Sequence, residues 1–188
     1  MIHGVAPQSR RRGQPLRLFV AAYPPPAVSE TLLGRCTSIT LPPHRLTPPE
    51  QVHMTLHFLG DVPIPELPEV EESVRRSAAG LGAFELRITR LRSLPERGPA
   101  RLVAAEADEH PTLAEVHRRL VHRLAMKPRA RDRFLPHFTL LRFTGGGAPV
   151  NIEQPMDPVV FEMREIVLVR SVLKPSGAEH AEVIRAPL

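Results

Sequence analysis

The chain has 188 residues, of which 42% are hydrophobic, and it carries 25 lysines and arginines against 20 aspartates and glutamates. This length suffices for one compact domain and excludes a large multidomain enzyme. No apolar run approaches the ~18 residues that a bilayer-spanning helix needs, and the single cysteine, Cys36, excludes an internal disulfide. We therefore expect a soluble protein of the cytoplasm, and we take it as a monomer, although the sequence does not show the oligomeric state.

The net charge of +5 favours polyanionic partners, because a basic surface attracts nucleic acids and releases their counterions. Much of this charge lies in two stretches, 10–17 and 127–133, although an ordinary solvated charge run has the same composition. Residues 1–14 carry arginines but lack the apolar segment of a secretory signal. We expect them to form a disordered basic arm, followed by a single bilobal domain over 15–188.

Hydrophobic periodicity and the positions of prolines predict the elements along the chain. In chain order we expect a strand at 16–22, a helix at 27–36, a strand at 53–59, a helix at 66–79, strands at 84–91 and 101–106 that form a hairpin, a helix at 112–126, and strands at 136–143, 159–169 and 179–185. Strands that alternate with helices and carry one polar face favour an α+β fold with antiparallel sheets over a purely parallel sheet.

A His-x-Thr motif occurs twice, as HMTLHF at 53–58 and as HFTLLRF at 137–143, each time on an expected strand. Side chains alternate along a strand, so each histidine shares a face with its threonine. In the first copy His57 follows on the same face, while Met54 and Phe58 point into the core. Two such faces opposed across a cleft would surround an anion of the size of a phosphate.

The opening of a cyclic phosphodiester requires a base for the attacking water and an acid for the departing ribose oxygen. Imidazoles, with pKa values of about 6.5, can do both at neutral pH, so we assign His53 and His137 as the catalytic pair. The hydroxyls of Thr55 and Thr139 can donate hydrogen bonds to nonbridging phosphate oxygens. This chemistry needs no metal and no cofactor. We take His53 as the acid and His137 as the base, although the two similar motifs also permit the reverse.

A metal site built from His53 and His57 is an alternative for the first motif. Residues i and i+4 of a strand lie roughly 13 Å apart, too far for both to bind one ion, so we expect no metal and place His57 in the groove. Arg17 and Phe19 are further candidates for RNA contacts, although the sequence favours a core position for Phe19. Cys36 has no neighbouring cysteine or histidine pattern and is expected to be a buried structural thiol.

Four segments resemble the bacterial and archaeal RNA 2′,3′-cyclic phosphodiesterases, also called 2′-5′ RNA ligase-like proteins, of the two-histidine phosphoesterase superfamily. They are RLFVA at 17–21, PPEQVHMTLHFLGDV at 48–62, PHFTLLRF at 136–143 and IVLVRSVLKPSG at 166–177. The resemblance covers nearly the whole chain after the N-terminal arm. It implies a bilobal, pseudo-twofold α+β fold in which antiparallel sheets line a central cleft and the helices lie outside.

The same resemblance implies an activity, the metal-independent hydrolysis of a 2′,3′-cyclic phosphate at an RNA end to a 2′-phosphate. It also implies that Arg142 contacts phosphate or RNA. The chain departs from the family at His57, Leu46 and His180, where lysine, an aromatic residue and tyrosine are common. Reversible 2′-5′ joining of RNA ends at the same site is one alternative function, and a noncatalytic RNA-binding module is another.

Overall fold

A computed structural model describes residues 14–124, 134–174 and 177–188. The basic arm expected at 1–14 lies almost wholly outside this part of the chain, and so does the basic stretch at 127–133. Among the described helices, none is both long and apolar enough to cross a membrane.

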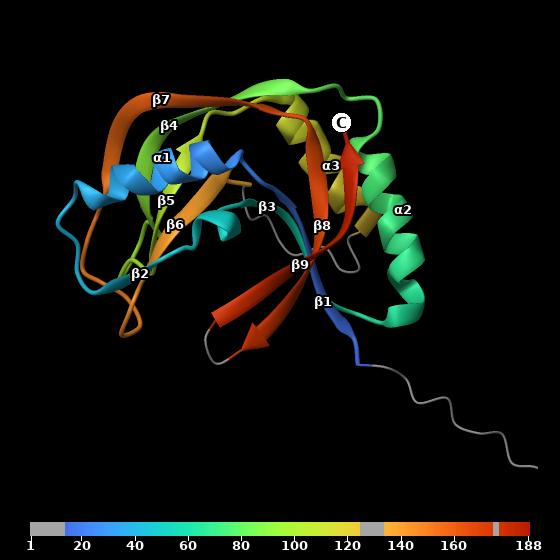
Figure 1. Ribbon diagram of the computed structural model, residues 1–188, viewed down its shortest axis with the longest axis horizontal. Helices are drawn as coiled ribbons and strands as arrows, with labels where there is room; N and C mark the ends of the chain where they lie inside the picture. The colour runs from blue at the N-terminus through green and yellow to red at the C-terminus, as the bar shows by residue number, and fades with distance from the viewer. Residues whose placement is uncertain (1–13, 125–133, 175–176) are drawn as a thin grey trace, which may run out of the picture.

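The described residues form three α-helices, nine strands and two short 3-10 helices (Figure 1). In chain order these are β1 (Leu16–Ala22), α1 (Pro26–Thr37), β2 (His44–Leu46), η1 (Pro49–Gln51), β3 (Met54–Val62), η2 (Ile64–Glu66), α2 (Leu67–Ala78), β4 (Phe84–Leu94), β5 (Leu102–Ala107), α3 (Pro111–Leu124), β6 (His137–Phe143), β7 (Glu153–Met163), β8 (Glu165–Lys174) and β9 (Gly177–Pro187). The predicted α+β class is confirmed. The final residues of the helix expected at 112–126 lie outside the described residues, and β2 and η1 were not predicted.

All nine described strands belong to one antiparallel sheet with the order β7-β4-β5-β6-β3-β1-β8-β9, and β2 pairs with β6 beside β3. The sheet has two halves, β7-β4-β5-β6 and β3-β1-β8-β9. They meet at one bridge, in which Met54 of β3 lies opposite Phe138 of β6. The two expected sheets are therefore two halves of one sheet, and the halves meet at the middle residues of the two His-x-Thr motifs.

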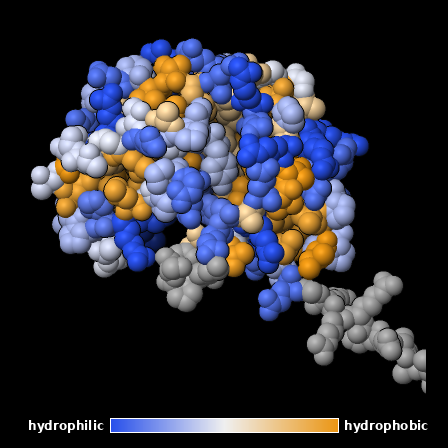
Figure 2. Space-filling view, viewed as in Figure 1, coloured by the Kyte–Doolittle hydropathy of each residue, from blue (hydrophilic) through white to orange (hydrophobic). Residues whose placement is uncertain are grey.

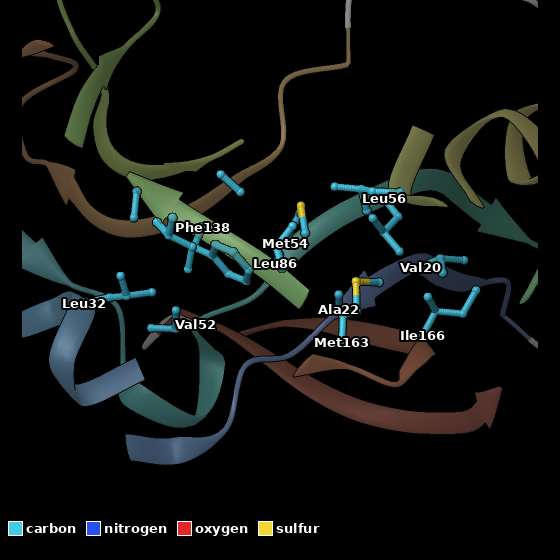
Figure 3. Packing of buried hydrophobic residues seen from close by; sticks show 14 of the residues in the cluster. Val20, Ala22, Leu32, Val52, Met54, Leu56, Leu86, Phe138, Met163 and Ile166 are labelled. Carbon is cyan, nitrogen blue, oxygen red and sulfur yellow. The ribbon is translucent and has the colours of Figure 1, made fainter. Parts of the chain in front are cut away.

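The main hydrophobic core lies on one side of this sheet, beneath the helices. Helices α2 and α3 contact strands of the β3-β1-β8-β9 half, and α1 contacts β6 and β7 of the other half (Figure 1). Met54, Phe138 and Leu86 point into this core from the sheet (Figure 3). Helix α3 buries Leu113 and Leu120 on its predicted apolar stripe, which is the arrangement expected of an amphipathic helix on a sheet.

The opposite side of the sheet carries a second and smaller apolar cluster. It contains Phe19, Ala21, Val167 and Val169, with Tyr23 packed against it. Strand β1 is thus buried on both sides, which explains its nearly continuous apolar sequence LRLFVAA. The ring of Phe19 is buried as a core ring would be, but it lies on the side of the sheet away from the main core.

The single strand expected at 159–169 is two strands, because β7 ends at Met163 and β8 begins at Glu165. Strand β7 pairs with β4 and β8 pairs with β1, so the chain crosses from one half-sheet to the other at Arg164 (Figure 1). The core-facing positions change from odd to even residue numbers across this crossing. One regularly alternating strand could not make that change.

Two register shifts in the pairing of β3 with β1 correct a second expectation. Thr55 lies opposite Ala21 of the smaller cluster, but His57 lies opposite Val20 of the main core. Directly paired residues share a side of the sheet, so His57 is on the core side. The regular alternation expected from His53 to His57 is therefore interrupted in β3, and a contact of half-buried His57 with RNA stays a prediction.

Candidate active site

The bridge between the half-sheets brings the two His-x-Thr motifs together. Their middle residues lie opposite each other and point into the core, so the flanking residues point to the other side. In an antiparallel pair this register sets His53 beside Thr139 and Thr55 beside His137. Direct neighbours lie about 5 Å apart and diagonal ones about 7–8 Å, so the histidines, on diagonal positions, can contact opposite sides of one phosphate.

Both imidazoles are oriented by the same kind of hydrogen bond. Nδ1 of His53 lies 2.6 Å from the carbonyl oxygen of Gln51, and Nδ1 of His137 lies 2.8 Å from that of Leu135. A carbonyl oxygen only accepts, so each Nδ1 carries a hydrogen and donates it. Each Nε2 is then the atom that can take a proton when the ring is neutral and give one when it is charged.

Aromatic side chains surround the ring of His53. The ring centroids of Phe19, Tyr23 and His180 lie 5.1, 5.5 and 5.1 Å from it. Phe19 also contacts His180 at 5.0 Å and stacks with Phe58 at 5.6 Å with an interplanar angle of 27°. These rings fix the plane of the His53 imidazole and exclude water from one side of it.

Burial lowers the pKa of His53 from 6.5 to about 4. The hydrogen bond to the carbonyl of Gln51 acts in the opposite sense, because it stabilises the charged ring. The positive charges of His180, Arg142 and His137 lower the pKa further. Without a bound anion, His53 is therefore neutral at pH 7.

Phe19 is buried, as one interpretation of the sequence expected, whereas the expected core position of Phe58 is wrong. Phe58 was expected in the core, but it is 50% exposed and stands opposite Phe19 after the register shift in β3. Phe19, a candidate RNA contact, is only 2% exposed. The ring that is exposed to solvent is therefore that of Phe58, and it stacks on the buried ring of Phe19.

Arg142 lies on the same side of the sheet as the motifs and is exposed. Its charge affects the pKa of His53, which places the two side chains within electrostatic reach. Arg142 pairs with Arg45 across β2 and β6. Sequence reasoning missed Arg45, because a strand of three residues in a proline-rich loop has no detectable periodicity.

A network of ion pairs lies beside the second motif. Arg92 is 2.9 Å from a carboxylate oxygen of Glu106 and 3.0 Å from one of Glu153. Arg90 approaches the same two carboxylates at 3.7 and 3.8 Å. Glu106 lies opposite His137 across β5 and β6, so this network of matched charges adjoins the second imidazole.

An open hollow of about 690 Å³ adjoins the first motif, between α1, η1 and the β8–β9 hairpin. Tyr23, His180 and Gln51, which all contact His53, are among its lining residues, as is Glu182. The volume lies within the range of ~300–1,000 Å³ that is usual for small-ligand sites. The cleft therefore extends past His53 on the side away from His137.

Outside this centre, Arg17 is exposed at the start of β1, and its contact with RNA stays a prediction. Cys36 is a buried residue of α1, as expected of a structural thiol, and burial raises the pKa of its thiol to about 11. Within the described ranges, no group of three or more His, Cys, Asp or Glu side chains could hold a metal ion. On the face seen in Figure 2, hydrophobic surface is divided into separate patches among hydrophilic side chains.

The sequence of this chain was compared with protein families and with known proteins. The model of a family described as the 2′-5′ RNA ligase superfamily matches residues 24–174. Over 176 residues the chain is 34% identical to the RNA 2′,3′-cyclic phosphodiesterase of Thermus thermophilus, and the match covers 86% of this chain and 85% of that protein. It is 33% identical over 128 residues to a protein of the same name from Geobacillus stearothermophilus, covering 65% of this chain and 41% of the relative.

Solved structures give the same fold. A crystal structure of a Thermus thermophilus protein superposes with a TM-score of 0.76 at 29% identity and covers 92% of this chain and 98% of its own. The structure of Escherichia coli LigT complexed with 3′-AMP gives a TM-score of 0.78 at 22% identity, covering 93% of this chain and 98% of LigT. The expected α+β architecture is therefore shared with these proteins.

Proposed function

Because the chain belongs to the 2′-5′ RNA ligase superfamily, we propose that it hydrolyses the 2′,3′-cyclic phosphate at an RNA end and leaves a 2′-phosphate. Relatives from Thermus and Geobacillus carry the name RNA 2′,3′-cyclic phosphodiesterase. The observation that carries the proposal is the pair of imidazoles, each held at Nδ1 by the carbonyl two residues earlier and set diagonally across one bridge. Two such Nε2 atoms can exchange protons with the same phosphate ester.

The exposed ring of Phe58 supports a position for the terminal nucleobase. Stacking of a base on an aromatic side chain contributes about 1–3 kcal/mol and tolerates every base. Phe58 lies beyond Thr55 along β3, at the end of the site where His137 stands. A base stacked there directs C1′ and O2′ of the ribose toward His137 and directs O3′ toward His53.

This orientation gives each histidine a role. Nε2 of neutral His137 takes a proton from water, whose oxygen attacks phosphorus in line with the P–O3′ bond. That bond breaks, and Nε2 of protonated His53 gives its proton to O3′. The phosphate stays on O2′, and Thr55 and Thr139 donate hydrogen bonds to its nonbridging oxygens as negative charge develops. The assignment of acid and base thus follows the sequence-based expectation.

The acid must be charged when the reaction begins, although burial lowers the pKa of His53 to about 4 in the empty cleft. The negative charge of a bound phosphodiester favours the imidazolium and opposes the effect of burial. Substrate binding is therefore coupled to the uptake of a proton. Every proton that moves in the reaction comes from water or from a histidine, so the proposal requires no metal and no cofactor.

The test is to incubate the protein, in excess chelator, with an RNA that ends in a 2′,3′-cyclic phosphate and to map the product phosphate. We expect a 2′-phosphate, with turnover reduced about 10²–10⁴-fold in His53→Ala and in His137→Ala. His122→Ala, which replaces an exposed histidine of α3, is the matched control and should keep full activity. Absence of turnover by the wild type, or activity that appears only when zinc is added back, would contradict the proposal.

The same experiment separates the two alternatives. A protein that joins RNA ends would give a 2′-5′-linked product when an RNA with a 5′-hydroxyl is added. A noncatalytic RNA-binding module would bind the RNA without turnover, and both histidine variants would change affinity alone.

A further inference from the structure

Two arginines face each other beside the catalytic bridge. Arg45 of β2 lies directly opposite Arg142 of β6, and both are exposed. Opposite residues of an antiparallel pair share a side of the sheet with Cβ atoms about 4.5–5.5 Å apart, and like charges in that position destabilise the fold. The protein therefore keeps a repulsive contact next to its active site.

Neither charge is engaged in an ion pair within the described part of the chain. Neither Arg45 nor Arg142 forms an ion pair with another described residue, whereas Arg90 and Arg92 on the same side of the sheet are matched by Glu106 and Glu153. Two unmatched guanidinium groups side by side are suited to a phosphate, which accepts forked hydrogen bonds from both.

The arginines stand at the opposite end of the site from Phe58. Along β6, Arg142 follows Thr139 in the direction away from His137, and three residues of strand span about 10 Å. Phe58 lies beyond Thr55 in the other direction along β3. The order along the cleft is thus an aromatic ring, the two motifs, and the arginine pair.

We propose that Arg45 and Arg142 bind the phosphodiester on the 5′ side of the terminal nucleotide, and that this contact selects RNA chains over cyclic mononucleotides. The proposal rests on the proposed function. In a ribose, the base is attached to C1′ and the 5′ oxygen to C5′, which extends from C4′, so the two lie at opposite ends of the edge that carries O2′ and O3′. With the cyclic phosphate between the histidines and the base on Phe58, the next phosphate extends toward the arginines.

The test compares two substrates with the same reacting group, adenosine 2′,3′-cyclic phosphate and an adenosine trinucleotide that ends in that group. For Arg45→Ala, we expect kcat/KM to fall about tenfold for the trinucleotide through KM and to stay unchanged for the mononucleotide. Arg76→Ala removes the same charge from the exposed surface of α2 and should change neither. An equal loss for both substrates, or no loss for either, would overturn the proposal.

Arg45→Glu separates binding from folding. It replaces the repulsive pair by an attractive one, so the melting temperature should stay the same or rise while the preference for the trinucleotide disappears. A lower melting temperature with an equal loss for both substrates would mean that Arg45 is structural, and the proposal would fail.

A binding experiment keeps this inference distinct from the proposed function. If the wild type turns over neither substrate, the proposed function fails, but the wild type should still bind a 3′-phosphorylated trinucleotide more tightly than the 3′-mononucleotide. Arg45→Ala should abolish that difference and reduce the slope of log affinity against log salt by about 0.7 for the lost phosphate contact. Equal affinities for both ligands in the wild type would overturn the inference.

Inorganic phosphate is the other source of the same chemistry. If the arginine pair binds RNA, inorganic phosphate should inhibit trinucleotide turnover only at high concentration. Phosphate should also inhibit mononucleotide turnover to the same extent in the wild type and in Arg45→Ala. If dilute phosphate changes mononucleotide turnover in the wild type and Arg45→Ala removes that change, the arginine pair binds the free phosphate ion instead, and the proposal fails.

Discussion

The two halves of the active site share a backbone design and differ in what surrounds it. His53 and His137 each donate an Nδ1 hydrogen to the carbonyl two residues earlier. Three aromatic rings then enclose His53, whereas His137 adjoins a network of matched charges through Glu106. The backbone hydrogen bond therefore leaves Nε2 of each ring available for proton transfer, and the unlike surroundings make the two imidazoles chemically different.

In the proposed mechanism, this difference would let two similar histidines take different roles. Burial favours the neutral form of His53 until an anion is bound, so under the proposed mechanism its proton is taken up together with the substrate. A symmetric pair of exposed imidazoles would have no such coupling. The comparison predicts that the two halves respond differently to substitution and to pH.

The largest expected effect comes from replacing each histidine and recording kcat against pH. The wild type should give a bell-shaped profile, because the base must be neutral and the acid charged. His137→Asn should remove the rise on the acidic side and His53→Asn the fall on the alkaline side, each with a loss of about 10²–10⁴-fold in kcat. If His137→Asn instead removed the alkaline fall and His53→Asn the acidic rise, His137 would be the acid and His53 the base.

The pH dependence of stability should also distinguish the halves. Because folding lowers the pKa of His53 from 6.5 to about 4, the unfolded chain binds more protons between these values, and stability is lost as the pH falls from 6.5 to 4. After allowance for the partial exposure of the ring, the loss is roughly 2 kcal/mol. Chemical denaturation of His53→Gln across this range should show a smaller loss. An unchanged pH dependence would mean that the ring titrates normally.

Removal of the exposed ring should affect binding more than chemistry. For Phe58→Ala we expect KM to rise about tenfold with little change in kcat, since one base-stacking contact is lost. Phe58→Tyr keeps the ring and should retain the wild-type KM, and Ile64→Ala removes an exposed apolar side chain elsewhere as a control. A fall in kcat alone would place the base away from Phe58.

The smallest expected effect is a shift in the titration of His53. Arg142→Gln removes one of the positive charges that disfavour the imidazolium, so the pKa of His53 should rise. The imidazole resonances followed by NMR would report it, with Arg76→Gln as the control. A pKa of His53 that stays in place would mean that its burial alone sets the value.

The placement of the two motifs could be predicted from the sequence because it depends on local alternation. His53, Thr55, His137 and Thr139 share one side of the sheet, as period-two geometry requires. The α+β class was readable for a similar reason, since strands and amphipathic helices leave their own periodicities. The shared face of these four residues could therefore be predicted without knowing which strands pair.

The rest depends on how strands pair, which the sequence does not display locally. The register shifts between β3 and β1 put His57 on the core side and expose Phe58, and only the partner strand determines them. Arg45 belongs to a strand of three residues that exists because β6 has a free edge beside β3. The crossing at Arg164 likewise reflects two different partners for β7 and β8.

The single bridge between the half-sheets has a consequence for the design of the site. A ladder of several bridges would fix the separation of the motifs by backbone hydrogen bonds, but here one pair, Met54 and Phe138, joins the halves. Both side chains are fully buried. The distance between the two imidazoles therefore depends on the volume of the Met54 and Phe138 side chains, which lie on the core side of the sheet, away from the imidazoles. A change of core volume at Met54 or Phe138 should therefore change the distance between the two imidazoles, although neither residue lies on the side of the sheet that carries them.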